Sequence, residues 1–245
     1  MNQKPIIGLV AAHHKENDRP FQNYTQFVDN YSERIIKSGG LPIGLVFPEG
    51  KFNPDLLKIC DGILLEGGPS IDSYQVNIVN YIMSSKLPTL AICLGMQTLI
   101  AYDWASKTYG PNYQSITGNF KREDEDNFLE KKSGHNNLNP FYLSQIDVSK
   151  HEINIDKESK LYKILKTDKC FVPSLHDYSV KNNVLDKSNY FKPAARSKDG
   201  TIEAIEAKDE NHFLIGTQFH PELEDKYQIL FDKLIIEAKK HKKLN

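Results

Sequence analysis

One cysteine stands where a strand-like pattern gives way to a helix-like one. In "TLAICLGMQTLI", small and β-branched residues lead up to Cys93, and apolar residues at helical spacing follow it. A sharp strand-to-helix turn lifts the side chain at the turn above the sheet, and Gly95 lets the chain bend there. The start of a helix favours the nucleophilic thiolate over the thiol. Cys93 is therefore a candidate nucleophile, with a buried structural thiol as the alternative.

A thiolate nucleophile needs a group that carries a proton to the leaving atom, and "FHPE" offers one. His220 follows the apolar run "LIGTQF", so it lies at the end of an expected strand and can project over the same sheet edge as Cys93. Glu222 can accept a hydrogen bond from the imidazole Nδ1–H and so fix the tautomer. Alone this motif says little, but together with the cysteine it predicts a Cys-His-Glu triad.

Two glycines follow another apolar run in "LLEGGPSID". The backbone N–H groups of Gly67 and Gly68 are not shielded by side chains, so they suit an oxyanion hole. The N–H of Leu94, the residue after the cysteine, would complete it. A glycine pair is more often an ordinary turn, but three such features at three strand ends favour catalysis.

The first hundred residues alternate between the patterns of strands and helices. We expect strands over 5–12, 42–47, 61–66 and 88–93. Helices are expected over 23–38, where Tyr24, Val28, Tyr31 and Ile35 stand at helical spacing, over 72–85, and from near residue 96. Such alternation predicts βαβ units and a parallel sheet with helices on both faces. In these sheets, ligands bind beyond the carboxyl ends of the strands.

The second part of the chain favours strands. Residues 103–135 are polar and irregular, and we expect a solvated loop or helix face there, with a lid over the site as the alternative. Strands are expected over 141–148, 151–155, 169–175, 190–208 with a "KDG" hairpin turn, and 212–219, before a helix over 224–242 that sets Ile229, Leu230, Leu234 and Ile235 on one side. No repeat or linker is visible, so we expect residues 1–245 to form one α/β domain.

The composition is typical of a soluble globular protein. Hydrophobic residues make up 39% of the chain and the net charge is −1, which gives no electrostatic reason to expect nucleic acid or a membrane as partner. Three cysteines fit a reducing compartment, so we expect a cytoplasmic location. Cys60 and Cys170 are interpreted as packing residues. No Cys/His cluster has the spacing of metal ligands, and we expect neither a metal nor a cofactor.

With these motifs in place, the sequence resembles the class I glutamine amidotransferase-like superfamily, and within it the γ-glutamyl hydrolase branch. The likeness spans nearly the whole chain. It is carried by "PIIGLV", "FVDNYSERIIKSGGLPIGLVFP", "DGILLEGGPSID", "LAICLGMQ", "SLHDYSVKN", "DGTIEAIE" and "IGTQFHPE". The cysteine turn and His-Pro-Glu are typical of the superfamily, and "LHDYSVKN" favours the hydrolase branch.

The resemblance implies a fold and a catalytic set. The fold would be a flavodoxin-like three-layer sandwich with a mostly parallel central sheet, a nucleophile elbow and extra antiparallel strands in the second half. Cys93 would be the nucleophile, His220 the general base and acid, and Glu222 the carboxylate that orients the imidazole. The backbone N–H groups of Gly68 and Leu94 would hold the oxyanion.

The resemblance also implies two binding residues. Gln97 would help to hold the α-amino acid end of a glutamyl group. His176 matches a histidine that lines the substrate cleft in the hydrolase branch, with a surface-loop histidine as the alternative. Two positions depart from the family pattern: Ala91 stands where glycine is usual, and Glu66 precedes the glycine pair where Thr, Ser or Pro is commoner. Glu66 could bind a cationic substrate group or face solvent.

The expected function is hydrolysis of a γ-glutamyl amide or isopeptide bond in a small-molecule substrate, through a thioester on Cys93. The first alternative is the glutaminase subunit of an amidotransferase, which would deliver ammonia to a separate synthase partner. The second is a non-enzymatic or redox-sensing protein on the same fold. The leaving amine and the oligomeric state, a homodimer included, stay open at this point.

Overall fold

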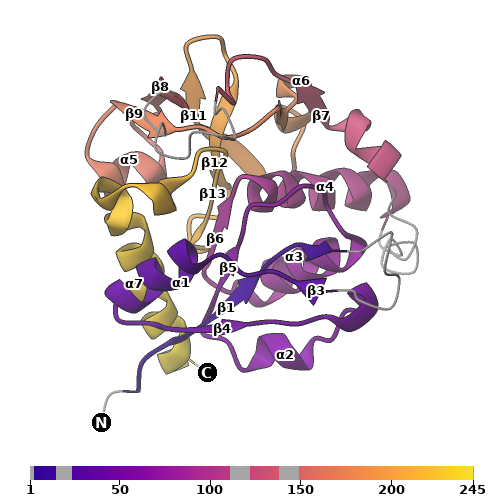
Figure 1. The fold of residues 1–245 in the computed structure, drawn as a ribbon, viewed down its shortest axis with the longest axis vertical. Coiled ribbons are helices and arrows are strands. Elements are labelled where there is room, and N and C mark those ends of the chain that lie inside the picture. Colours follow the sequence, from indigo (N-terminus) through magenta and orange to yellow (C-terminus); the bar gives the residue numbers. More distant parts are fainter. Residues whose placement is uncertain (1–2, 15–23, 111–121, 138–148, 245) are drawn as a thin grey trace.

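A nine-stranded sheet forms the centre of the protein in a computed structural model that describes residues 3–14, 24–110, 122–137 and 149–244 (Figure 1). One half of the sheet is parallel and the other antiparallel. In spatial order the strands are β4 (Leu41–Gly44), β1 (Ile6–Val10), β5 (Gly62–Leu65), β6 (Thr89–Ile92), β13 (Leu214–Thr217), β12 (Ile202–Ala207), β11 (Phe191–Ser197), β8 (Lys150–Ile155) and β9 (Lys169–Pro173). The expected mostly parallel sheet with added antiparallel strands is confirmed.

Helices cover both faces of this sheet (Figure 1). On one face lie α1 (Asp29–Lys37) and α7 (Gln228–Leu244), and on the other α3 (Ser73–Ser85) and α4 (Leu94–Tyr109). The shorter elements are α2 (Asp55–Lys58), α5 (Lys160–Leu165), α6 (Asn182–Leu185), β2 (His13–His14), β3 (Tyr24–Thr25), β7 (Leu129–Lys131) and β10 (Tyr178–Val180). The three-layer arrangement expected from the sequence is therefore confirmed. No helix in the described ranges is long and apolar enough to cross a membrane.

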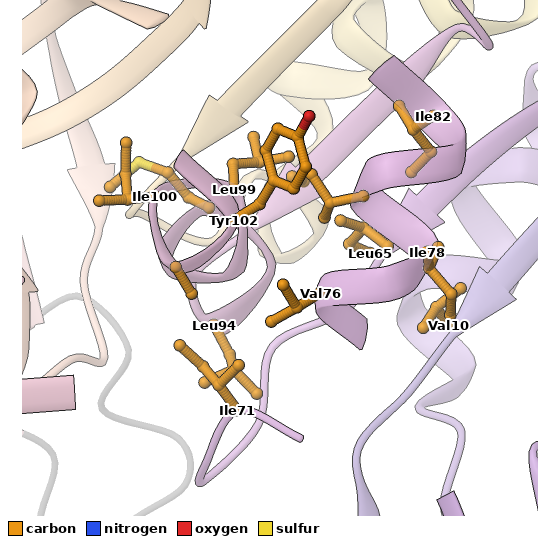
Figure 2. Close-up of a cluster of buried hydrophobic side chains, with 14 of the residues drawn as sticks. Val10, Leu65, Ile71, Val76, Ile78, Ile82, Leu94, Leu99, Ile100 and Tyr102 are labelled. Carbon is orange, nitrogen blue, oxygen red and sulfur yellow. The ribbon is translucent and has the colours of Figure 1, made fainter. Parts of the chain in front are cut away.

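Side chains that alternate along each strand supply two separate cores. Leu64 packs with the helices α1 and α7, whereas its neighbours Ile63 and Leu65 face the core under α3 and α4. Figure 2 shows part of the core under α3 and α4, where Leu65 and Val10 meet apolar residues of these helices. Strands buried on both faces explain why these runs are continuously apolar.

The first helix is shorter than the sequence predicts. It begins at Asp29 rather than near residue 23, because Tyr24–Thr25 forms a strand that pairs with His13–His14. Val28, which the helical spacing included, has an extended backbone and is exposed. Tyr31 and Ile35 keep the expected buried positions.

The region 103–135 is more regular than expected where the structure describes it. The helix α4 continues to Tyr109, and its Asp103 is fully buried, with Lys107 at 2.7 Å. Residues Arg122–Asn127 form a 3₁₀ helix, and β7 pairs antiparallel with β10. The rest of this region that could form the alternative lid, residues 111–121, and the expected strand 141–148 lie outside the described residues.

The C-terminal elements follow the sequence closely. The "KDG" hairpin is confirmed, with Gly200 at φ +83° in the turn between β11 and β12. On α7 the predicted apolar side is correct for Leu230, Leu234 and Ile235, which are buried. The prediction is wrong for Ile229, which is 43% exposed on the outer side of the helix.

The first turn of α4 comes unusually close to the sheet at Gly95. A Cβ placed on Gly95 would lie 2.5 Å from the carbonyl oxygen of Leu65, which no side chain can tolerate. Because this backbone atom belongs to a central strand, it cannot move aside without disturbing β5. Glycine therefore sets how deeply the helix that follows Cys93 sits against the sheet.

We expect Gly95→Ala to destabilise the fold. Overpacking of this kind lowers the free energy of unfolding by about 1–3 kcal/mol, although alanine is the better helix former by about 1 kcal/mol. Urea denaturation measures the change. The control is Thr108→Ala on the exposed side of the same helix, which should change stability by less than about 0.5 kcal/mol. A Gly95→Ala protein as stable as the wild type would contradict the close approach.

Candidate active site

Cys93 occupies a strained backbone position between β6 and α4. Its φ of 52° and ψ of −106° fall in a region that residues with a side chain rarely adopt. Two backbone bonds hold it there: Cys93 N–H donates to the Thr217 carbonyl at 2.7 Å, and Gln97 N–H donates to the Cys93 carbonyl at 3.1 Å. The expected elbow geometry is present at this junction.

The alanine that departs from the family pattern does not disrupt this turn. Ala91 is fully buried in the core under α3 and α4, and it pairs with Leu65 on one side and Gly216 on the other. The space left by the missing side chain of Gly216 is filled by Met96, since a Cβ on Gly216 would lie 2.7 Å from Met96 Cγ. Ala91 thus lies in the sheet beside a residue without a side chain, Gly216.

His220 and Glu222 form a tight buried pair just after β13. His220 Nδ1 lies 2.6 Å from Glu222 Oε1, and the His220 N–H donates to the Pro173 carbonyl at 3.0 Å. Burial would lower the pKa of His220, but the charges of Glu222 and Cys93 and its contacts with both hold that pKa well above the ordinary value. The imidazole is therefore held as a cation between a carboxylate and the cysteine.

The cysteine and the histidine meet beside Gly67. A Cβ on Gly67 would lie 3.2 Å from His220 Cε1 and 3.6 Å from Cys93 Cβ, so both side chains crowd one point on the backbone. The same Cβ would lie 3.1 Å from the hydroxyl of Tyr31, which accepts a hydrogen bond from Gly67 N–H at 3.2 Å. A side chain at this position would therefore push the Tyr31 hydroxyl and the His220 ring out of their places.

The second glycine lies against the residue that follows the cysteine. A Cβ on Gly68 would approach Leu94 Cδ2 to 2.8 Å and Ala12 Cβ to 2.9 Å. The structure thus brings Gly68 and Leu94 together, as a shared oxyanion hole requires, while the Tyr31 hydroxyl accepts from Gly67 N–H. The assignment of the oxyanion donors stays a prediction.

Two glutamines connect the cysteine to β10, which pairs with β7 outside the nine-stranded sheet. Gln218 Nε2 lies 3.6 Å from Cys93 Sγ and Gln97 Nε2 donates to Gln218 Oε1 at 3.2 Å. Gln97 also donates to the Tyr178 carbonyl at 3.1 Å, so its amide has protein partners. Sequence reasoning missed Gln218 and Tyr31. Contacts between distant segments of the chain, rather than a local pattern, place both at the site.

His176 is not a surface histidine. It is 3% exposed, its Nδ1 lies 3.0 Å from the Tyr178 carbonyl, and its Nε2 lies 3.5 Å from Glu203 Oε1. The Tyr178 carbonyl also accepts a hydrogen bond from Gln97, so His176 and Gln97 share one backbone partner. A direct role in substrate binding stays a prediction.

Glu66 is buried beside the same site rather than facing solvent. Its side chain is 1% exposed, and its Oε2 accepts from Val28 N–H at 3.4 Å. Burial raises the pKa of Glu66 to about 8, opposed by the Val28 hydrogen bond and reinforced by the charge of Glu222. Near neutral pH this carboxyl group is therefore mostly protonated and can act as a hydrogen-bond donor.

We expect Glu66→Gln to change how stability depends on pH. Folded Glu66 keeps its proton up to about pH 8, whereas the unfolded chain releases it near the ordinary value of 4.5. The contribution of this group to the free energy of unfolding is full below 4.5 and is lost as the pH rises through about 8. The variant cannot ionise, so its stability relative to the wild type should rise over this window and level off above it.

Urea denaturation of both proteins at several pH values between about 5 and 9 measures this difference. The control is Glu158→Gln, an exposed carboxylate in the loop before α5, whose curve should run parallel to that of the wild type. A constant difference between Glu66→Gln and the wild type across the range would show that Glu66 does not carry a raised pKa.

A central sheet with a cysteine on a strand-to-helix turn, and a histidine–glutamate pair at the next strand end, is the architecture of the class I glutamine amidotransferase-like proteins. The sequence matches the peptidase C26 family over residues 5–73 and 69–222. The chain belongs to this family, so the resemblance expected from its motifs is confirmed.

The relatives of this chain include both a hydrolase and a synthase. The γ-glutamyl-γ-aminobutyrate hydrolase PuuD of Escherichia coli K12 is 26% identical, over 97% of this chain and 94% of its own length. A CTP synthase of Hydrogenobaculum is 27% identical over 83% of this chain, which spans 40% of that enzyme. The glutaminase domain of Trypanosoma brucei CTP synthase, solved with acivicin, has a TM-score of 0.66 at 17% identity, covering 97% of this chain and 94% of its own. The last likeness concerns the fold.

Proposed function

We propose that this protein hydrolyses a γ-glutamyl amide or isopeptide bond through a γ-glutamyl thioester on Cys93. The observation that carries the proposal is the position of His220, held between Glu222 and Cys93 with a raised pKa. A cationic imidazole next to a cysteine stabilises the thiolate and has a proton ready for a leaving amine. Family membership and the hydrolase PuuD support the same reaction class.

The first half of the reaction would form the thioester. The Cys93 thiolate attacks the γ-carbonyl carbon, and the negative charge moves to the carbonyl oxygen, where the N–H groups of Gly68 and Leu94 hold it. His220 then gives its Nε2 proton to the amine nitrogen as the C–N bond breaks. The amine leaves, and the γ-glutamyl group stays on sulfur.

The second half would release glutamate. Neutral His220 takes a proton from water, the hydroxide attacks the thioester carbon, and the carbon–sulfur bond breaks to return the Cys93 thiolate. Glu222 keeps the imidazole in the tautomer that works in both halves, because its carboxylate accepts from Nδ1–H. Gln97 and protonated Glu66 would lie near the bound glutamyl group.

A second function is supported by the CTP synthase relatives. In this alternative the same chemistry acts on free glutamine, and a separate synthase subunit receives the ammonia. A protein without catalysis, such as a redox sensor built on Cys93, is the third alternative. The three differ in what reacts at Cys93 and in which substrates are consumed.

We expect a chloroketone analogue of glutamine to alkylate Cys93 in the intact protein. Peptide mass spectrometry after proteolysis locates the adduct. Cys170, partly buried on β9 with a pKa raised by burial, is the internal control and should stay unlabelled. Labelling elsewhere than Cys93, or no labelling, would contradict the catalytic proposal and leave the non-catalytic alternative.

We expect Cys93→Ser and His220→Ala each to lower kcat/KM by about 10³-fold or more, because members of one catalytic unit fail together. The assay follows release of glutamate from a panel of γ-glutamyl amines and from free glutamine. Cys170→Ser is the matched control and should keep wild-type activity. Turnover of glutamine alone, and only when a synthase is added, would favour the glutaminase function over the hydrolase.

A further inference from the structure

Three histidines surround one buried glutamate next to the proposed active site. His135 Nδ1 lies 3.2 Å, His151 Nε2 2.9 Å and His176 Nε2 3.5 Å from the same atom, Glu203 Oε1. Glu203 is fully buried, and His135 and His176 are 7% and 3% exposed. We call these four residues the His-Glu cluster. They come from the loop after β7, from β8, from the loop after β9 and from β12.

The outer nitrogens of two of these rings fix the tautomers. His176 Nδ1 lies 3.0 Å from the Tyr178 carbonyl, which can only accept, so Nδ1 carries a proton. His135 Nε2 lies 3.2 Å from Asp199 Oδ2, so Nε2 carries the proton there. In the neutral rings, each inner nitrogen therefore presents a lone pair. An outer N–H bound to a carbonyl or carboxylate is the usual support of a metal-binding histidine.

The inner atoms lack conventional partners. His135 Nδ1, His151 Nε2, His176 Nε2 and both oxygens of Glu203 are buried and make no hydrogen bond of good geometry with any residue in the described ranges. Buried polar atoms are nearly always paired, and lone pairs that face each other repel. The cluster calls for a cation at its centre.

We propose that the His-Glu cluster binds one Zn²⁺ ion. His135 Nδ1, His176 Nε2 and a Glu203 oxygen lie within 4.8 Å of one another and would be three of the ligands. His151 Nε2 would be the fourth. Imidazole and carboxylate ligands in a four-coordinate site match zinc, whereas Ca²⁺ and Mg²⁺ prefer oxygen ligands. The sequence indicated no metal, because the ligands stand far apart along the chain and show no motif spacing.

The ion would be structural, since four protein ligands leave no open position for a substrate. It would also stabilise two residues next to Cys93 in the proposed active site. The Tyr178 carbonyl accepts from both His176 and Gln97, and Gln218 N–H donates to the Glu203 carbonyl at 2.8 Å. A bound ion would thus fix both glutamines that connect to Cys93, and it would join the late segments of the chain.

The test is a metal titration of the full-length protein after dialysis against a chelator. Cys93→Ser is used as the background, so that the thiol cannot bind the metal. We expect one equivalent of ZnCl₂ to bind in calorimetry and to raise Tm. One equivalent of Co²⁺ should give the intense visible absorption of a tetrahedral site without a thiolate charge-transfer band. Absence of both signals would overturn the proposal, whatever the catalytic activity.

Variants in the same background locate the ion. Glu203→Gln and His176→Asn should each weaken Zn²⁺ binding by about 100-fold or more, and Asp199→Asn by about 10-fold through the outer support of His135. The control is His241→Gln in α7, outside the cluster, which should bind as tightly as the background. If Glu203→Gln does not fold, Asp199→Asn and the Co²⁺ spectrum decide. Equal Zn²⁺ affinity in all these proteins would overturn the assignment.

Discussion

The strained backbone of Cys93 is the constraint on which the rest of this structure depends. A residue with φ of 52° and ψ of −106° persists only where its surroundings outweigh the cost. Here the sheet holds it from one side, through the bond from Cys93 N–H to Thr217, and the helix holds it from the other. Gly95 allows the helix to sit against the Leu65 carbonyl, so the packing of α4 and the position of Cys93 at the sheet edge are set together.

Around that turn, the charges are arranged so that one ion pair dominates. His220 lies between Glu222 and Cys93 and is held as a cation, whereas Glu66 is held neutral because it is buried near the charge of Glu222. Tyr31, also buried, keeps its proton: burial and then the charge of Glu222 raise its pKa well above the ordinary value. The site therefore excludes extra negative charge that would compete with the thiolate for the imidazolium.

The sequence predicted those parts of the site that depend on strand ends. Cys93, His220 and Gly67 meet because parallel strands bring their carboxyl ends to one edge, and this follows from local patterns. Tyr31 and Gln218 could not be predicted as site residues, because what sets them apart is a tertiary contact. The same holds for the His-Glu cluster, whose members come from four segments. The predicted start of the first helix was wrong for a related reason. Tyr24 and Val28 have helical spacing, but Tyr24 pairs in a strand with β2, so the helix begins only at Asp29.

The strand order has a consequence for folding during synthesis of the chain. β13 lies between β6 and β12 in the middle of the sheet, although it is made near the end of synthesis, and Gln218 and Cys93 are separated by 125 positions in the chain. A growing polypeptide can assemble β4, β1, β5 and β6 early, but β6 then presents an unpaired apolar edge. Such edges invite aggregation, and contacts between distant segments form slowly. The β6 edge of a nascent chain therefore stays unpaired until β13 has been synthesised.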